Sequence, residues 1–138
     1  MRAYLDSSVV LRVVLGEPGR LVAWSRVTAA VTSEITRVEC LRSLDRLRLA
    51  GEMNDRELAR RRATLLGLLD GCELVRVNRV VLDRAAEPFP TLVRTLDALH
   101  LSSALLLHRR SPALRFATHD VDLGTAALAV GLSVIGNP

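Results

Sequence analysis

The sequence predicts an α/β protein with a central parallel sheet and helices on both faces of that sheet. Its 138 residues suit a single domain spanning residues 1–138. Hydrophobic residues make up 49% of the chain, which is enough to build a substantial core. Short apolar runs alternate with segments of helical periodicity, the pattern that is typical of parallel β/α units.

The first half of the chain holds two expected strands and four expected helices. Each strand is a short apolar run, and a glycine follows three of the helices as a stop signal. Ser33 is expected to cap the longest helix, whose buried stripe should contain Ile35, Val38 and Leu41. In order, the elements are a strand over 2–6, helices over 9–15 and 19–29, a strand over 30–32, and helices over 34–50 and 54–69.

The second half continues the alternation of strands and helices. Pro88 and Pro90 end one helix, and Thr95 is expected to cap the next. In order, the elements are a strand over 73–77, a helix near 79–87, a helix over 96–109, a strand over 114–118, a helix over 121–130 and a strand over 132–135.

The chain has a net charge of +4, and its basic residues are all arginines. A GC-rich genome accounts for this usage as well as phosphate binding does, so it only weakly favours a nucleic-acid partner. The absence of lysine excludes a Walker P-loop. It also disfavours response-regulator receivers and haloacid-dehalogenase phosphatases, which place a lysine beside their acids.

Other features give little evidence of function. The run Arg60–Arg62 is expected to be mostly a solvated helix face, with some capacity to contact RNA or a partner. Cys40 and Cys72 do not form a metal-binding pattern, and we expect both to be reduced. No apolar run is long enough to span a membrane and no signal peptide is evident, so we expect a cytoplasmic protein without membrane contact.

Five acids occupy suggestive positions. Asp6 follows the first strand, and Asp120 and Asp122 follow the strand over 114–118. Because ligands bind at the carboxyl ends of parallel strands, Asp6 and Asp120 should lie together there. Helices that start at the same edge would bring Glu39 and Asp97 toward them. Converging carboxylates repel one another, and a divalent cation relieves this repulsion. Oxygen ligands suit Mg²⁺ or Mn²⁺.

Helix capping is an alternative explanation for three of these acids. Asp6, Asp97 and Asp120 all lie near helix starts, where aspartate accepts backbone N–H bonds. Glu39 does not fit that explanation, because it lies inside a helix beside residues that are expected to be buried. The pattern therefore leaves both a cap and a ligand role open for each aspartate.

Histidines and serines provide two further possibilities. His100 and His119 could together perform acid–base cleavage of RNA through the 2′-hydroxyl, although a supporting role is favoured. Ser7 and Ser8 lack the surroundings of a nucleophile. A serine hydroxyl that hydrogen-bonds a carboxylate or caps the helix is the favoured interpretation.

Four segments taken in order resemble the PIN-domain nucleases, and most closely the VapC toxins of bacterial toxin–antitoxin pairs. They are YLDSS, ExTRxE, LDALHLSSA and FATHDxDL. The resemblance implies a three-layer α/β/α sandwich and a metal-dependent ribonuclease. It also implies an RNA substrate, a small antitoxin partner and a homodimer.

The same resemblance assigns roles to individual residues. The implied catalytic and metal-binding quartet is Asp6, Glu39, Asp97 and Asp120. Asp122 matches an additional acid of some members, and either it or Asp120 could be nearer the metal. Thr118 matches a hydroxyl that is often present in the last motif.

Two other classes of function remain open at this point. One is a non-catalytic module that binds nucleic acid or protein on the same fold. The other is a DNA nuclease or phosphatase that uses the same acidic metal site. The complete quartet favours the metal-dependent endoribonuclease over both.

Overall fold

The computed structural model describes residues 1–136, whose strands are short and whose helices are longer. The strands are β1 (Arg2–Leu5), β2 (Ala29–Ser33), β3 (Glu73–Val75), β4 (Arg115–Ala117) and β5 (Ser133–Ile135). The helices are α1 (Ser7–Leu15), α2 (Ile35–Leu49), α3 (Asp55–Asp70), α4 (Arg79–Ala85), α5 (Thr95–His108) and α6 (Val121–Ala129), with a short 3₁₀ helix over Trp24–Arg26.

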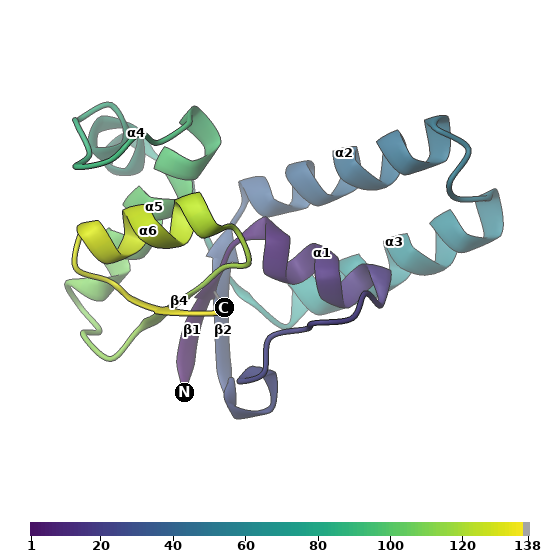
Figure 1. Ribbon diagram of the computed structural model, residues 1–138, viewed down its shortest axis with the longest axis horizontal. Helices are drawn as coiled ribbons and strands as arrows, with labels where there is room; N and C mark the ends of the chain where they lie inside the picture. Colours follow the sequence, from purple (N-terminus) through teal and green to yellow (C-terminus); the bar gives the residue numbers. More distant parts are fainter. Residues whose placement is uncertain (137–138) are drawn as a thin grey trace.

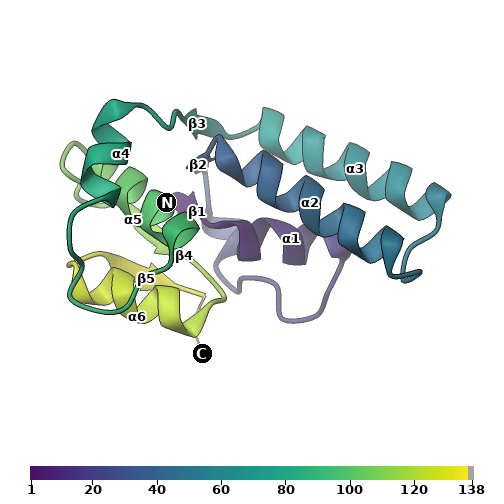
Figure 2. The same cartoon turned by 90° about the horizontal axis from the view of Figure 1, so that it is seen from above.

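The five strands form one sheet in the order β3-β2-β1-β4-β5, and every pairing is parallel. Helices cover both faces of this sheet (Figures 1 and 2). The predicted fold class, a three-layer α/β/α sandwich, is confirmed. Among the described residues, no helix combines the length and the apolar character needed to cross a bilayer.

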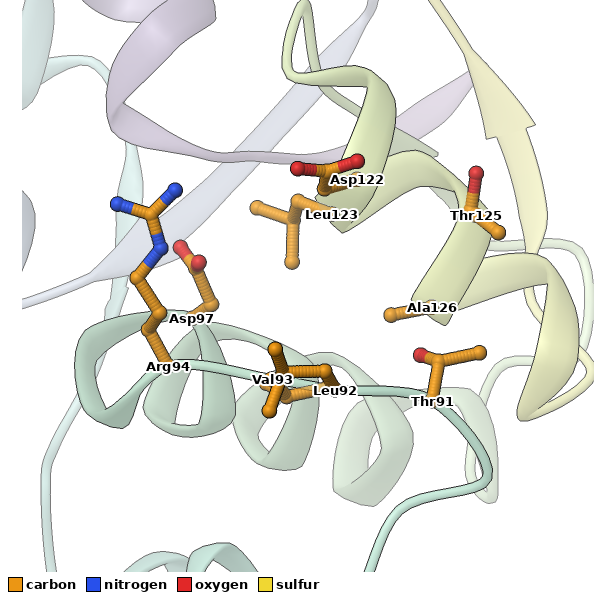
Figure 3. Close-up of a pocket in the computed structure, with 9 residues that line it drawn as sticks. All are labelled: Thr91, Leu92, Val93, Arg94, Asp97, Asp122, Leu123, Thr125 and Ala126. Atoms are coloured by element: carbon orange, nitrogen blue, oxygen red, sulfur yellow. The ribbon is translucent and has the colours of Figure 1, made fainter.

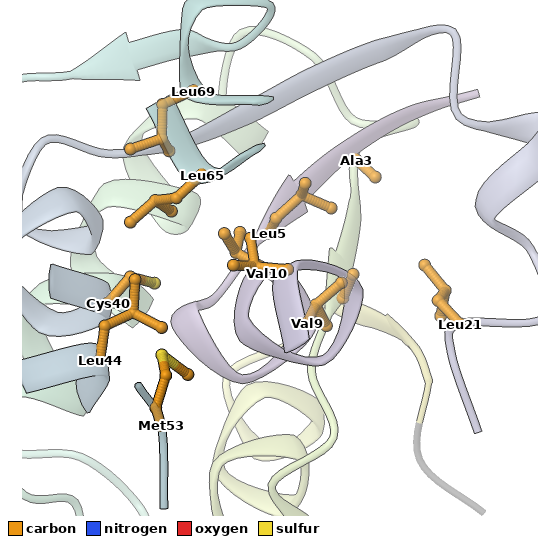
Figure 4. Close-up of a cluster of buried hydrophobic side chains, with 12 residues drawn as sticks. Ala3, Leu5, Val9, Val10, Leu21, Cys40, Leu44, Met53, Leu65 and Leu69 are labelled. Atoms are coloured by element: carbon orange, nitrogen blue, oxygen red, sulfur yellow. The ribbon is translucent and has the colours of Figure 1, made fainter. Parts of the chain in front are cut away.

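Strand β1 lies at the centre of the sheet and contributes to two hydrophobic cores. Its side chains alternate between the faces, so Ala3 and Leu5 pack with α1, α2 and α3 (Figure 4), whereas Tyr4 packs with α5 and α6. All three side chains are fully buried. Burying one large apolar side chain contributes about 1.5–3 kcal/mol, so both cores stabilise the position of β1.

The connections place a topological switch point between β1 and β4. Helices α1, α2 and α3 connect β1 to β2 and β2 to β3 on one face of the sheet, and α5 and α6 flank β4 on the other face. Ligands in open parallel sheets bind beyond the carboxyl ends of the strands at this position. The register pairs Leu5 with Ala117, and the Asp6 amide donates to the Ala117 carbonyl at 3.1 Å. Asp6 and Thr118 therefore meet at this edge.

Helix α1 ends at the predicted glycine, and a distant arginine completes its cap. Gly16 has φ +66°, which glycine adopts without strain, and its N–H closes the last turn. Arg61 donates from Nη1 to the Val14 carbonyl at 3.0 Å. The middle residue of the arginine run is thus structural, while Arg60 and Arg62 are exposed as predicted.

The helix expected over 19–29 is wrong, since only a short 3₁₀ helix forms there. Leu21, Trp24 and Val27 recur every third residue, which imitates a helical stripe. These side chains instead pack against the first core from irregular chain. The same core includes Ala117 of β4 and Ile135 of β5, so this segment takes the place of a helix over that part of the sheet.

The expected buried stripe of α2 is wrong at Val38, which is 61% exposed. Ile35 and Leu41 are half-buried, and the fully buried positions are Thr36, Cys40 and Leu44. Thr36 is tolerated in the core because its hydroxyl pairs with that of Thr32 at 2.7 Å. The buried face of α2 is therefore rotated from the one that apolar residues alone predicted.

Neither predicted cap occupies the cap position of its helix. The Ser33 hydroxyl accepts from the Ile35 amide at 3.3 Å, but Glu34 is the cap residue of α2. Thr95 is the first residue of α5 rather than its cap, and Arg94 occupies the cap position without a side-chain bond. Cys40 and Cys72 are both free.

Candidate active site

Asp6 combines the two roles that the sequence left open. It caps α1, because Oδ1 accepts from the Val9 amide at 3.1 Å and from the Ser8 hydroxyl at 2.6 Å. Its other oxygen, Oδ2, accepts from the Thr118 hydroxyl at 2.7 Å. The residue is only 3% exposed. Burial raises the pKa of this carboxyl even though the hydroxyls of Ser8 and Thr118 favour its charged form.

Two hydroxyls connect this carboxylate to the end of β4. Ser8 Oγ accepts from the His119 amide at 2.9 Å, and Thr118 Oγ1 accepts from the Asp120 amide at 3.0 Å. Asp120 in turn caps α6 by accepting from the Leu123 amide at 2.9 Å. The ends of β1 and β4 are thus held in one hydrogen-bonded network, and the predicted role of Ser8 is confirmed.

Asp97 lies in the first turn of α5 in a very different environment. It is half-buried, and among residues 1–136 no hydrogen bond to its carboxylate is found. Burial raises its pKa, and the nearby charges of Asp120 and Asp6 raise it further, while His100 and Arg94 oppose the shift. Asp120 and Asp6 are therefore close enough to Asp97 to repel its charged form.

Glu39 joins the site through His100. The Nε2 atom of His100 lies 2.6 Å from Glu39 Oε1, and Nδ1 lies 2.9 Å from the Tyr4 hydroxyl. A carboxylate only accepts, so Nε2 carries the hydrogen and donates to Glu39. His100 is 1% exposed and both its nitrogens are engaged. It therefore orients Glu39.

This geometry argues against cleavage by a pair of histidines. His100 has no free ring nitrogen to face a phosphate. His119 directs Nδ1 to the Gly136 carbonyl at 3.0 Å, so that nitrogen carries the hydrogen. The two rings are thus held by separate protein partners.

The sequence analysis missed the role of Tyr4 and the contact between His100 and Glu39. Two sequence signals could have revealed them. Tyr4 lies two residues before Asp6 in a strand, and His100 lies three residues after Asp97 in a helix, so each shares a face with an acid. Their partners, however, lie far apart along the chain.

A groove of about 290 Å³ opens between α5, α6 and the segment that precedes α5 (Figure 3). Arg94 and Asp97 line one side, and Asp122 lies across from them at the start of α6. Asp6, Glu39 and Asp120 do not line this groove. Asp97 and the exposed Asp122 are therefore the two predicted acids that line this groove.

The acidic side chains of the site have the chemistry that a divalent cation requires, but they do not form a complete set of metal ligands. The donors are carboxylate oxygens. Burial and the nearby charges of Asp120 and Asp6 raise the pKa of Asp97, and a cation would relieve the repulsion. Within the described part of the chain, no three histidine, cysteine, aspartate or glutamate side chains are positioned as a metal-binding group. The carboxylates share the edge but do not converge on one point.

Comparisons with known proteins agree with this fold. A PIN-domain family model matches residues 3–127. Ribonuclease VapC46 of Mycobacterium tuberculosis is 34% identical over 137 residues, which cover 96% of this chain and 95% of that protein. Ribonuclease VapC47 of Mycobacterium tuberculosis is 30% identical over 135 residues, which cover 93% and 91%.

A solved structure gives the same result for the fold. VapBC-5 from Mycobacterium tuberculosis, a member of the VapBC family of toxin–antitoxin systems, superimposes with a TM-score of 0.61 and 24% identity. The match covers 96% of this chain and 94% of that one. With these matches spanning nearly its whole length, the chain belongs to the PIN-domain family, in the group of VapC ribonucleases.

Proposed function

We propose that this protein is a metal-dependent endoribonuclease and the toxin of a toxin–antitoxin pair. The observation that carries the proposal is the position of Asp97 at the switch point of the sheet, where burial and the nearby charges of Asp120 and Asp6 raise its pKa. An assembly of this kind is destabilising without a cation, so its presence favours metal-assisted chemistry. The similarity to VapC ribonucleases over most of the chain supports RNA as the substrate.

The proposed ligands for Mg²⁺ or Mn²⁺ are Asp6, Glu39, Asp97 and Asp120. Asp122, which lines the groove beside Asp97, is a further proposed ligand. Such ions polarise phosphate oxygens and lower the pKa of bound water. The protein contributes orientation: Ser8 and Thr118 hold the Asp6 carboxylate, and His100 holds that of Glu39. Attack on phosphorus by water rather than by the 2′-hydroxyl leaves a 5′-phosphate on the product.

A separate small antitoxin and a second copy of the chain are the proposed protein partners. Support for the antitoxin comes from the similarity to a chain of VapBC-5, a toxin–antitoxin system. An exposed acidic edge is also a suitable target for an inserted arginine, which would pair with two carboxylate oxygens. Co-purification from the native host, followed by a cleavage assay with and without the recovered partner, tests this part.

Mapping cleavage ends on total RNA tests the catalytic proposal. We expect cleavage with Mg²⁺ or Mn²⁺, 5′-phosphate ends, and no cleavage in EDTA or by the Asp97→Asn variant. Full activity in EDTA, or ends with a 2′,3′-cyclic phosphate, would contradict the metal mechanism. Parallel incubation with single-stranded DNA and with a phosphate monoester distinguishes a ribonuclease from a DNA nuclease or a phosphatase.

A further inference from the structure

A second and larger groove, of about 800 Å³, lies on the face of the sheet that α1, α2 and α3 leave partly uncovered. Its walls are the end of α1, the irregular segment between α1 and β2, the start of β4 and the chain after β5. Figure 1 shows that segment returning from α1 to β2. We call this feature the arginine groove, after Arg12, Arg20, Arg26 and Arg115, which line it.

The arginine groove has a consistently positive lining. Among residues 1–136, no acidic side chain lines it and none of its four arginines forms an ion pair. Arg20, Arg26 and Arg115 are exposed, whereas Arg12 donates from Nη1 to the Gly19 carbonyl at 3.2 Å. The N-terminal ammonium of Met1, which bonds the Arg26 carbonyl at 3.0 Å, adds a further positive charge.

One end of the arginine groove reaches the acidic site. His119 lines that end, and its amide bonds the Ser8 hydroxyl that also holds Asp6. Arg115 lines the groove at the start of β4, four residues before His119, which corresponds to a path of about 13 Å. The groove therefore extends from the amino end of β4 to the chain that follows this strand, beside the network that holds Asp6.

The groove also offers apolar surface between its charges. Val22 is 92% exposed and Val121 is 60% exposed, and both line the groove. Gly136 closes one wall with φ +96°, and a side chain there would meet the Thr118 carbonyl at 2.7 Å. Arginine forks match phosphate oxygens, and exposed apolar side chains can pack against unpaired bases. A single RNA strand has both features.

We propose that the arginine groove binds the sugar-phosphate backbone of single-stranded RNA and guides it toward the acidic site. This inference rests on the proposed function, because it takes RNA as the substrate. An acidic protein segment is the rival occupant. The unpaired arginines together with exposed valines favour RNA, since a strand with splayed bases satisfies both.

A pair of charge-matched double variants tests the inference. Arg26→Gln/Arg115→Gln removes two exposed groove arginines, and Arg60→Gln/Arg62→Gln removes two exposed arginines from α3, which projects away from the sheet (Figures 1 and 2). Both are made in the Asp97→Asn background, with Mg²⁺ present, and binding of a short labelled single-stranded RNA is titrated against salt.

We expect the groove pair to weaken RNA binding by about tenfold at low salt and to lower the slope of log affinity against log salt by about 1.4, or about 0.7 per phosphate contact. The α3 pair should bind as the Asp97→Asn parent does. Unchanged binding by the groove pair, or equal weakening by both pairs, would overturn the inference. Loss of antitoxin binding with RNA binding intact would assign the groove to a protein and overturn it as well.

Cleavage by the same arginine variants with Asp97 restored separates this inference from the proposed function. If the wild type cleaves RNA and the groove pair cleaves it with an unchanged KM, the groove proposal fails while the ribonuclease proposal stands. If the groove pair shows the expected binding defect but the wild type cleaves no RNA, the groove proposal stands and the catalytic one fails.

Discussion

Asp6 and Asp97 lie at the same edge of the sheet but in opposite environments. Asp6 is buried and accepts hydrogen bonds from Ser8, Val9 and Thr118. Asp97 is half-buried, lines an open groove and is raised in pKa by burial and by neighbouring aspartates. The Asp6 carboxylate is thus held in place by hydrogen bonds, whereas that of Asp97 is repelled by neighbouring carboxylates. A bound cation would relieve this repulsion. The cap role of Asp6 is therefore compatible with its proposed role as a metal ligand.

The largest expected effect is the loss of catalysis in Asp6→Asn and Asp97→Asn. Each should lower the cleavage rate by about a thousandfold, because several kcal/mol of transition-state stabilisation would be lost. Asp70→Asn, an exposed acid at the end of α3, is the matched control and should retain full activity. Activity close to that of the wild type in either variant would remove that residue from the proposed ligand set.

Thermal melting of the same two variants in EDTA should distinguish their environments. Asp97→Asn should keep or raise the melting temperature, since it removes repulsion without removing a hydrogen bond. Asp6→Asn should lower it, because an amide cannot accept at both oxygen positions and Thr118 loses its acceptor. Equal shifts of the melting temperature in both variants would contradict the proposed difference between Asp6, which is held by hydrogen bonds, and Asp97, which is repelled by neighbouring acids.

The next largest effect concerns His100, which orients Glu39 from the buried side. His100→Leu should lower activity and metal affinity by about 10–100-fold, the usual range for residues that hold a ligand in place. His100→Gln keeps an N–H donor and should recover part of the loss. His108→Gln, on the same helix, is the control. Metal-dependent thermal stabilisation measures the affinity, and equal losses in the Leu and Gln variants would contradict a positioning role.

A smaller effect on the stability of the protein is expected from the hydroxyls of Ser8 and Thr118, which connect the ends of β1 and β4. Thr118→Val removes the donor to Asp6 and the acceptor for the Asp120 amide, which should cost about 1–3 kcal/mol of unfolding free energy. Thr125→Val, whose hydroxyl bonds only the Val121 carbonyl on the exposed side of α6, should change stability by less than about 0.5 kcal/mol. Urea denaturation in EDTA compares them, and similar values for both would show that the network contributes no stability.

The smallest effect is a pH dependence of the metal-free protein. The folded pKa of Asp97 lies above its ordinary value of 3.8, so the folded state binds protons more readily than the unfolded state. This contribution to stability is complete below pH 3.8 and is lost as pH rises through the folded pKa. We expect denaturation in EDTA to show a weaker fall in stability with rising pH for Asp97→Asn than for the wild type. A steeper fall in stability for Asp97→Asn than for the wild type would contradict a raised folded-state pKa of Asp97.

Local patterns predicted most of the elements, and their failures share a cause. The helix over 19–29 was predicted from residues spaced by three, and the stripe of α2 from apolar residues alone. In each case tertiary packing decided the outcome. Leu21 and Trp24 pack on the uncovered sheet face, and the hydroxyl of Thr36 pairs with that of Thr32 at the end of the preceding strand. Periodicity reports which residues could share a face, but packing decides which face is buried.

The sequence by itself determined the α/β alternation, the position of Asp6 and Asp120 after apolar strands, and the oxygen-rich chemistry of the acids. These follow from residue type and from spacing within a few residues. Only the tertiary structure decided that Asp6 is held by Thr118, that Glu39 is held by His100, which Tyr4 contacts in turn, and that four arginines line one groove. Such contacts join residues up to 112 positions apart, and they arise only when the parallel strands bring their ends to one edge of the sheet.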